Sequence, residues 1–275
     1  MTRRFAVVTD STADLPDAWR QRYGIEVVPL KVLFGQETFR DRVDITDEEF
    51  FRRLAASSTL PTTSAPSPGE FAEVYRRLAK DYEGCISIHI GAQLSATAEA
   101  ARVGAEAVDG FKVNVVDSQT VSMPIAFLCR TAAECATLDE ATEAVQQRVP
   151  KSRVLALLDT LRYLEMGGRL SRAQAMIGTM LDLKPLLLVA HAEIKPVDRV
   201  RTRSRAIPRM VEFFKTELPV EHLAVMHAQA PDEAEQVAGV LRKDLPSLEV
   251  TVGQIGTVLG THTGPKALGI VYLKA

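Results

Sequence analysis

Short apolar runs alternate with helical patterns along the first half of this chain, and the alternation restricts the fold more than any other feature. Phe5–Thr9 and Lys112–Val116 are apolar runs typical of strands, and they end in Asp10-Ser11 and Asp117-Ser118. Helical patterns follow the strands. The order of strand, helix, strand, helix is typical of proteins in which helices cover the faces of a sheet. We therefore predict an α/β fold.

The second half has a different pattern, because hairpins are mixed with helices. Pro185–Ala190 and Glu193–Val197 are two extended runs separated by a short turn, which predicts a hairpin. A chain of 275 residues is long enough for two smaller domains that share an interface. We predict two α/β domains, an N-terminal one over residues 1–155 and a C-terminal one over residues 156–275.

Composition excludes several classes of function. The formal net charge is −2, and the sequence has no basic stripe of the kind that binds nucleic acid. No apolar stretch approaches the roughly 20 residues of a membrane span, so we expect at most transient contact with a membrane. The three cysteines fit no zinc motif, and their odd number does not indicate a disulfide framework. We therefore expect a cytoplasmic protein without a metal site.

Two hydroxyl-rich stretches, Leu60–Phe71 and Gln93–Ala98, each lie at the start of a predicted helix. Such a turn offers N–H and O–H donors together with the positive end of the helix dipole, which favours an anion. Ser67 and Glu70 form a capping box, but capping does not account for Thr63 and Ser64 just upstream.

Ser95 and Thr97 give the second stretch more hydroxyls than a helix cap needs, because one residue is enough for that role. No charged general base accompanies either stretch. The pattern indicates a site that holds an acidic group rather than one that transforms it.

Two further residues are candidates for the site. Arg169 follows two glycines in the motif Gly167–Ser171, where its guanidinium can serve as a fork for phosphate or carboxylate, or can be a surface residue after a helix end. His262 lies in Gly260–Pro265, which we predict to be a loop bounded by glycines. The other histidines lie in or beside predicted strands and are expected to be structural; they are His89, His191, His222 and His227.

The residues alone leave two other functions open. Ser95, His262 and Asp117 can be combined into the triad of a serine hydrolase or thioesterase, although Ser95 lacks the G-x-S-x-G turn of such enzymes. The same helix starts can also form a phosphate-binding module. The sequence has neither of the Gly-rich motifs that cradle nucleotide phosphates.

Taken together and in order, these motifs resemble the DegV family of bacterial lipid-binding proteins. The resemblance spans nearly the whole chain, and several separated motifs in one order are more specific than any single motif. The matching pieces are Asp10–Pro16, Thr63–Phe71, Leu94–Thr97, Val116–Ser118, Tyr163-Leu164 with Gly167–Ser171, Lys184-Pro185 and Gly260–Pro265.

The resemblance implies two α/β domains with a long-chain fatty acid buried between them and no catalytic centre or cofactor. It implies an acyl-carrying subunit of a fatty acid kinase, which presents the carboxylate to a separate ATP-binding subunit. That subunit makes an acyl phosphate for phospholipid synthesis. Carried over to this chain, the carboxylate-binding residues are Thr63, Ser64, Ser95, Thr97 and His262, and the residue that engages the kinase subunit is Arg169.

Several positions depart from the family pattern, among them Gly91-Ala92, which stand where serines are common. Ala65 replaces the usual Gln, Ala96 replaces the usual Gly, and Lys266 stands where a Gly often follows the Gly-Pro pair. A positive φ at position 96 would cost a residue other than glycine about 1–2 kcal/mol. We therefore expect Ala96 to narrow the carboxylate loop if its backbone has that conformation.

Overall fold

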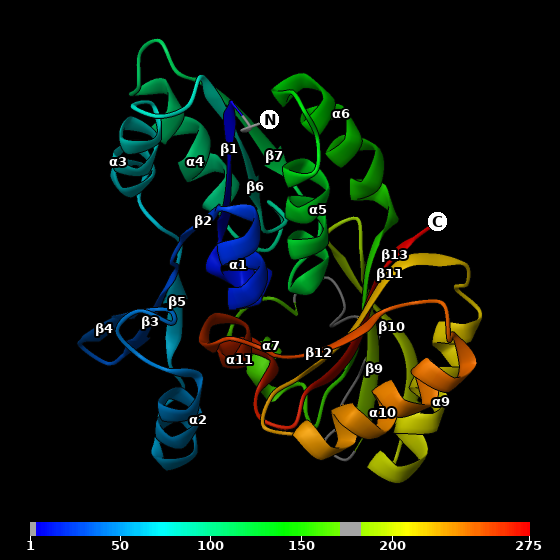
Figure 1. Cartoon of the computed structure of the whole chain (residues 1–275). Helices are drawn as coiled ribbons and strands as arrows, with labels where there is room; N and C mark the ends of the chain where they lie inside the picture. Colours follow the sequence, from blue (N-terminus) through cyan, green and yellow to red (C-terminus); the bar gives the residue numbers. More distant parts are fainter. Residues whose placement is uncertain (1–3, 171–182) are drawn as a thin grey trace.

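The computed structural model describes residues 4–170 and 183–275. Its first sheet has four parallel strands in the order β2-β1-β6-β7 (Figure 1). The strands are β1 (Phe5–Asp10), β2 (Ile25–Val28), β6 (Gly84–His89) and β7 (Lys112–Asp117). β1 and β6 are buried along their whole length, as is typical of central parallel strands covered on both faces. The predicted α/β fold is confirmed.

Alternate residues of β1 explain how the sheet is covered. Ala6 and Val8 pack with α3 and α4, whereas Phe5 and Val7 belong to the cluster that includes α5. The helices of this half include α1 (Asp17–Tyr23), α3 (Pro68–Leu78), α4 (Thr97–Glu106), α5 (Met123–Ala133) and α6 (Leu138–Arg148). The predicted capping box of Ser67 and Glu70 is present at the start of α3.

The second sheet has six strands in the order β10-β9-β8-β13-β11-β12. They are β8 (Ser152–Leu157), β9 (Lys184–Ala190), β10 (Glu193–Val200), β11 (Val220–His227), β12 (Val250–Gln254) and β13 (Leu268–Lys274), and the short helix η2 (Val149–Lys151) precedes β8. β9 and β10 form the predicted hairpin. The boundary predicted near residue 155 falls within β8, and the division into domains stays a prediction.

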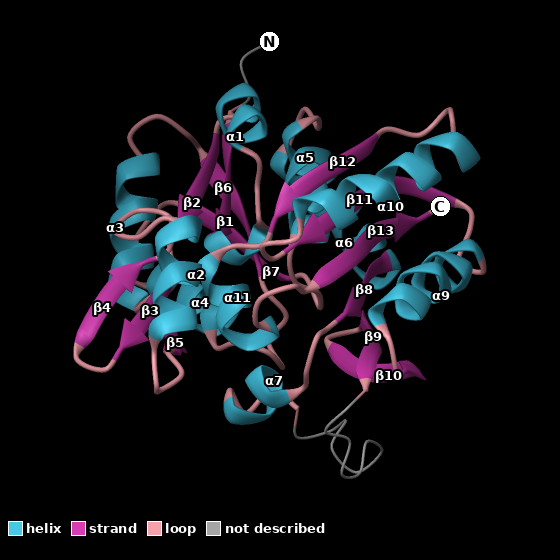
Figure 2. Ribbon diagram, turned by 90° about the horizontal axis from the view of Figure 1, so that it is seen from below, coloured by secondary structure: helices cyan, strands magenta, loops and turns pink. Residues whose placement is uncertain are grey.

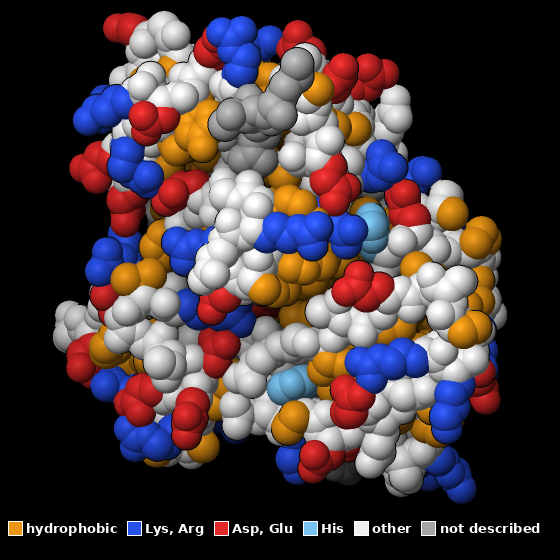
Figure 3. Space-filling view, in the orientation of Figure 1, with side chains coloured by type: hydrophobic (Ala, Val, Ile, Leu, Met, Phe, Trp, Pro, Cys, Tyr) orange, Lys and Arg blue, Asp and Glu red, His pale blue; other side chains and the backbone are white. Residues whose placement is uncertain are grey.

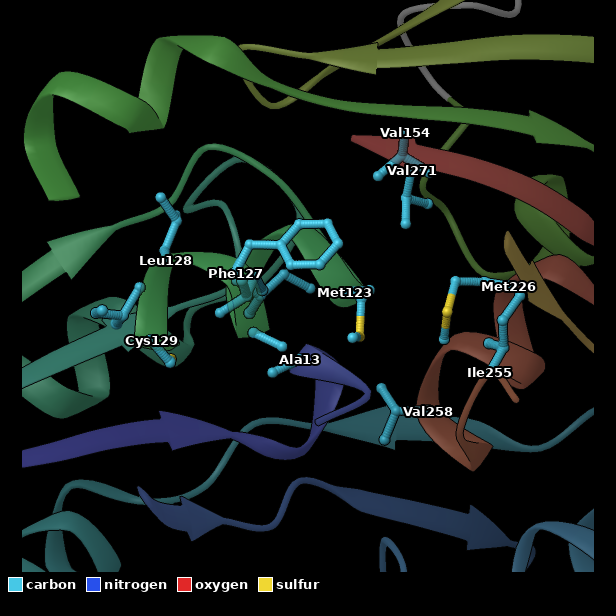
Figure 4. Packing of buried hydrophobic residues seen from close by; sticks show 14 of the residues in the cluster. Ala13, Met123, Phe127, Leu128, Cys129, Val154, Met226, Ile255, Val258 and Val271 are labelled. Carbon is cyan, nitrogen blue, oxygen red and sulfur yellow. The ribbon is translucent and has the colours of Figure 1, made fainter. Parts of the chain in front are cut away.

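Helices α9 (Arg203–Lys215) and α10 (Pro231–Asp244) cover one face of the second sheet. The other face packs against the first half of the chain, and Figure 4 shows Met123 and Phe127 of α5 in the same cluster as Met226 and Val271. The rings of Phe127 and His222 stack with their centroids 5.1 Å apart. None of the helices within residues 4–170 and 183–275 has the length and apolar character to cross a membrane.

A small antiparallel sheet, β4-β3-β5, stands beside these two, with α2 (Asp47–Ala56) next to it (Figures 1 and 2). Its strands are β3 (Lys31–Phe34), β4 (Glu37–Arg40) and β5 (Thr62–Ser64). Helix α11 (Thr257–Thr263) packs against α2, β3, β5 and the short helix η1 (Ser11–Ala13), and also against α7 (Arg162–Met166). The last part of the chain thus reaches across to the first half.

The hydroxyl-rich stretch contains a strand that its pattern does not predict, because Thr62–Ser64 pair with β3 as β5. One local prediction is wrong. Gly260–Pro265 was expected to be a loop, but most of it lies in α11. Tertiary packing explains why these residues form a helix. A Cβ at Gly260 would lie 2.8 Å from the ring of Phe51 and 2.9 Å from that of Phe50, so α11 lies in direct contact with α2. Glycine therefore allows the helix to pack directly against α2.

Candidate functional site

An apolar cavity lies between the two halves of the chain, with walls from the first half and from β8, β9, β10, α7 and α11. The centre of a water-sized sphere can occupy a volume of about 110 Å³ inside this cavity. Its walls include Ile90, Val121, Val154, Ala156, Leu187 and Val189. Thr63, Ser95, Arg169, His262 and Thr263 are the polar residues among its lining. On the face in Figure 3, hydrophobic side chains are visible at the centre, among intermixed acidic and basic ones.

Thr63 and His262 form the first polar pair of this cavity. Thr63 Oγ1 lies 2.9 Å from His262 Nε2. Successive side chains of a strand point to opposite faces, so Thr63 faces His262 while Ser64 points away from it. Ser64 is exposed, does not line the cavity and donates to the carbonyl oxygen of Ala65 at 3.1 Å. The structure therefore does not bring Ser64 to the site with the other predicted residues.

His262 is held neutral at ordinary pH. Burial, together with the nearby charge of Arg169, lowers the pKa of His262 to about 4. Within the described part of the chain, its Nδ1 atom is buried and has no hydrogen-bond partner. A buried N–H without an acceptor is rarer than a lone pair without a donor, so we assign the proton to Nε2. Nε2–H then donates to Thr63 Oγ1, which leaves the Thr63 hydroxyl hydrogen free to bind another group.

Ser95 and Thr97 form the second polar pair. Ser95 Oγ and Thr97 Oγ1 lie 2.8 Å apart, with Ser95 on the cavity and Thr97 fully buried. The helix cap between them is Ala96, with φ −75°. That backbone is open to any L-residue, so the condition under which Ala96 would narrow the loop, a positive φ, is not met.

Arg169 lies at the exposed edge of the cavity. Its Nη1 donates to the carbonyl oxygen of Gly167 at 2.7 Å, and its Nε donates to that of Leu94 at 3.4 Å. Arg169 therefore links the loop before Ser95 to the glycine that lies against His262. Ser171, the last residue of the Gly167–Ser171 motif, lies outside the described residues.

The site residues do not form a hydrolase triad in the described structure. Asp117 accepts hydrogen bonds from the backbone N–H groups of Ala92 and Gln119, each at 3.0 Å. Ser95 is paired with Thr97, and His262 with Thr63.

Elsewhere in the structure, an aspartate, a histidine and a serine do contact one another in the order of a catalytic triad. The contacts join Asp10, His89, Ser87 and Tyr75 with separations of 3.0, 2.7 and 2.8 Å. These four side chains are completely buried, so a substrate cannot reach them. The network ties β1, β6 and α3 together.

Two carboxylates that the sequence analysis missed contact the helix of His262. Asp14 and Asp41 are both buried, and they accept hydrogen bonds from Gly256 and Thr257 at the start of α11. Asp14 belongs to the Asp10–Pro16 motif, but no local pattern distinguishes a carboxylate that caps a distant helix. No group of three or more metal-binding side chains occurs among residues 4–170 and 183–275.

Comparison with known proteins agrees with the resemblance seen in the sequence. A family model described as an uncharacterised protein of the DegV family matches residues 4–275. A DegV domain-containing protein of Streptomyces coelicolor is 40% identical over 280 residues, covering 98% of this chain and 99% of the relative. Protein DegV of Bacillus subtilis is 34% identical over 276 residues, covering 97% of this chain and 98% of the relative.

Solved structures agree with the fold. The Bacillus subtilis structure, described as DegV, a fatty acid binding protein, has a TM-score of 0.91 and 33% identity, with 100% of both chains covered. A Thermus thermophilus structure, described as fatty acid binding of a DegV family protein, has a TM-score of 0.90 and 31% identity, with coverage of 99% of this chain and 100% of the other. This chain belongs to the DegV family.

Proposed function

We propose that this protein binds a long-chain fatty acid, with the alkyl chain in the apolar cavity and the carboxylate beside Thr63 and Ser95. The observation that carries this proposal is the combination of apolar walls with two hydroxyls, each paired with a further polar side chain. Burying an alkyl chain contributes about 0.8 kcal/mol per CH₂ group. A chain of about 16 carbons therefore gains on the order of 10 kcal/mol before the costs of association.

The two hydroxyls match what a carboxylate needs. A buried carboxylate without hydrogen bonds is very costly, and each bond to a charged group contributes about 1.5–3 kcal/mol. Because His262 Nε2–H donates to Thr63, the Thr63 hydroxyl can donate to one carboxylate oxygen. Thr97 can donate to Ser95 in the same way, which frees the Ser95 hydroxyl for the other oxygen. Thr63, Ser95, Thr97 and His262 therefore form the proposed carboxylate site, without Ser64.

The family resemblance supports a finer role. We propose that the carboxylate is presented in the cytoplasm to a separate ATP-binding kinase subunit, which forms an acyl phosphate used in phospholipid synthesis. Arg169 supports this role because it is exposed at the edge of the cavity, where a guanidinium can meet phosphate or an acidic group of the partner. The lack of a base beside Ser95 in the described structure disfavours the hydrolase alternative.

Mass spectrometry under native and denaturing conditions tests the binding of a lipid. We expect the native mass to exceed the chain mass by that of one fatty acid, which denaturation releases. Delipidated protein that hydrolyses a labelled acyl ester would contradict the proposal and favour the hydrolase. Tight phosphate binding without lipid binding would favour the phosphate module instead.

Reconstitution tests the finer role. The lipid-loaded protein, its cognate ATP-binding subunit and labelled ATP should together form acyl phosphate. Mixtures that lack either protein should not form it. Equal product formation by the ATP-binding subunit with free fatty acid alone would contradict the presenting role.

A further inference from the structure

Helix α11 cannot cap its own N-terminus with a side chain. Its cap residue is Gly256, and the first N–H groups of a helix have no acceptor within that helix. Gly256 N–H donates to Asp14 Oδ1 at 2.8 Å. The N–H and Oγ1 of Thr257 donate to Asp41 Oδ1 at 3.2 and 2.7 Å. The acceptors are thus 242 and 216 residues away in the sequence.

A third contact fixes the same segment to the first half. Arg42 Nη2 donates to the carbonyl oxygen of Gln254 at 2.9 Å and lies 3.6 Å from Asp14 Oδ1. The same Nη2 atom donates to Asp47 Oδ2 at 3.0 Å. Asp14, Asp41 and Arg42 of the first half therefore bind the end of β12 and the start of α11. This segment leads to His262.

The backbone conformations of Asp14 and Arg42 indicate that the surrounding structure fixes these two residues in place. Asp14 has φ 47° and Arg42 has φ 57°, which residues other than glycine adopt only at a cost. Such conformations persist where the surroundings determine them. A Cβ at Gly256 would lie 3.2 Å from Asp14 Oδ1 and 3.2 Å from Arg42 Cζ, so the absence of a side chain there allows the close approach.

His262 lies in the last turn of the helix that these carboxylates hold. α11 has seven residues, so a shift at its start is transmitted directly to His262 about 8 Å away. We propose that Asp14 and Asp41 are positioning residues for the head-group site: they cap α11 from the other half of the chain and thereby place His262 against Thr63. This inference rests on the proposed binding of a fatty acid and adds the groups that set the geometry of its carboxylate site.

Asp41 offers the sharper test. Its Oδ1 accepts both bonds from Thr257, while its Oδ2 has no hydrogen-bond partner among the described residues. Asp41→Ala removes the cap, whereas Asp41→Asn keeps an oxygen atom that can accept both bonds from Thr257. Thr257→Val removes one bond to Asp41 and keeps the shape of the side chain, so it serves if Asp41→Ala does not fold. Leu241→Ala, on the buried face of α10, is a destabilising control away from α11.

The affinities for a fatty acid and for the alcohol of the same chain length separate positioning from general destabilisation. Asp41→Ala should weaken binding of the acid about tenfold and binding of the alcohol less than about twofold, because most walls of the alkyl cavity lie outside α11. Asp41→Asn should restore the affinity for the acid, and Thr257→Val should lower it about threefold. Equal losses for acid and alcohol, no loss for the acid, or the same split in Leu241→Ala would overturn the proposal.

Nitrogen NMR of histidine in the lipid-free protein gives a second measurement. Asp41→Ala should change the Nε2 and Nδ1 signals of His262 and leave those of His89 as they are, while Asp41→Asn leaves both unchanged. Unchanged His262 signals in folded Asp41→Ala protein would overturn the positioning role. If the wild-type protein binds no fatty acid, the proposed function fails, and these signals still decide whether the carboxylates place His262.

Discussion

Thr63 Oγ1 and His262 Nε2 lie 2.9 Å apart although 199 residues separate them in the sequence. The contact joins a three-residue strand of the first half to a short helix near the end of the chain. Because the imidazole is neutral, it orients the Thr63 hydroxyl without bringing a positive charge into the cavity. The proposed head-group site is therefore a set of neutral donors that depends on the packing of α11.

The neighbouring residues Thr63 and Ser64 provide a matched pair of variants. Thr63→Val removes a hydroxyl that lines the cavity, and it should weaken fatty acid binding about tenfold. Ser64→Ala changes an exposed side chain on the opposite face of β5 and should leave the affinity within about twofold. Titration of delipidated protein with a fluorescent fatty acid measures both. A larger loss in Ser64→Ala would restore Ser64 to the carboxylate site.

Gly167 should tolerate no side chain. A Cβ at this position would lie 2.3 Å from His262 Nδ1 and 3.0 Å from the carbonyl oxygen of Tyr163, so Gly167→Ala must displace the imidazole or the backbone. We expect weaker fatty acid binding and a lower melting temperature. Gly239→Ala, where a Cβ meets open space on α10, is the matched control and should not weaken binding. Normal binding by Gly167→Ala would argue against the close packing of His262.

His262 should make the fold less stable in acid. Its pKa is about 4 in the folded protein and 6.5 as an ordinary histidine, so between these values the unfolded chain binds more protons. The free energy of unfolding contributed by this residue is complete above pH 6.5 and is lost as the pH falls towards 4. Urea unfolding at pH 7 and pH 5 should show a decrease about 1–2 kcal/mol smaller in His262→Asn than in the wild type. Identical decreases would show that His262 is not held neutral by burial.

Arg169 should act on the kinase reaction more than on lipid retention. Its side chain is exposed and its bonds within the described structure are to backbone carbonyl groups, so Arg169→Ala should leave the co-purified fatty acid nearly unchanged. Acyl phosphate formation with the cognate ATP-binding subunit should fall about tenfold, which corresponds to one lost charge-assisted hydrogen bond. Arg162→Ala changes another exposed arginine nearby and should keep the wild-type rate. Loss of the lipid with normal turnover per bound lipid would contradict the assigned role.

Lys266 takes the left-handed backbone, with φ 62°. Lys266→Gly should therefore raise the free energy of unfolding by about 1 kcal/mol, because glycine adopts this conformation without the steric cost. Lys266→Ala keeps that cost while it removes the charge, so it should not stabilise the protein. Urea unfolding of the three proteins separates the two effects, and equal stability of the Gly and Ala variants would exclude a conformational origin.

The sequence predicts those parts of the molecule whose causes are local. Strands β1 and β7, the hairpin of β9 and β10 and the capping box at Ser67 depend on patterns within a few residues, and all of them are present. Helix α11 depends instead on caps from Asp14 and Asp41 and on packing against α2. Such causes leave no local pattern, so the same residues suggested a loop.

In the candidate site too, local patterns could be predicted from the sequence and tertiary contacts could not. Residue types and motif order pointed to Thr63, Ser95, Arg169 and His262, and the structure places all four on one cavity. Ser64 was grouped with Thr63 because the two are adjacent, but strand alternation sends their side chains to opposite faces. Pairing with β3 determines that alternation, and the pairing was not visible in the hydroxyl-rich stretch.

The late position of α11 in the chain also affects how the protein is made. Residues 257–263 complete a cavity whose other walls come from earlier residues, such as Leu30 and Ile194. While the ribosome still holds α11, the growing chain lacks His262, and one wall of the cavity is absent. The proposed lipid site is therefore incomplete in a nascent chain, and we expect the ligand to enter only after α11 has folded into place.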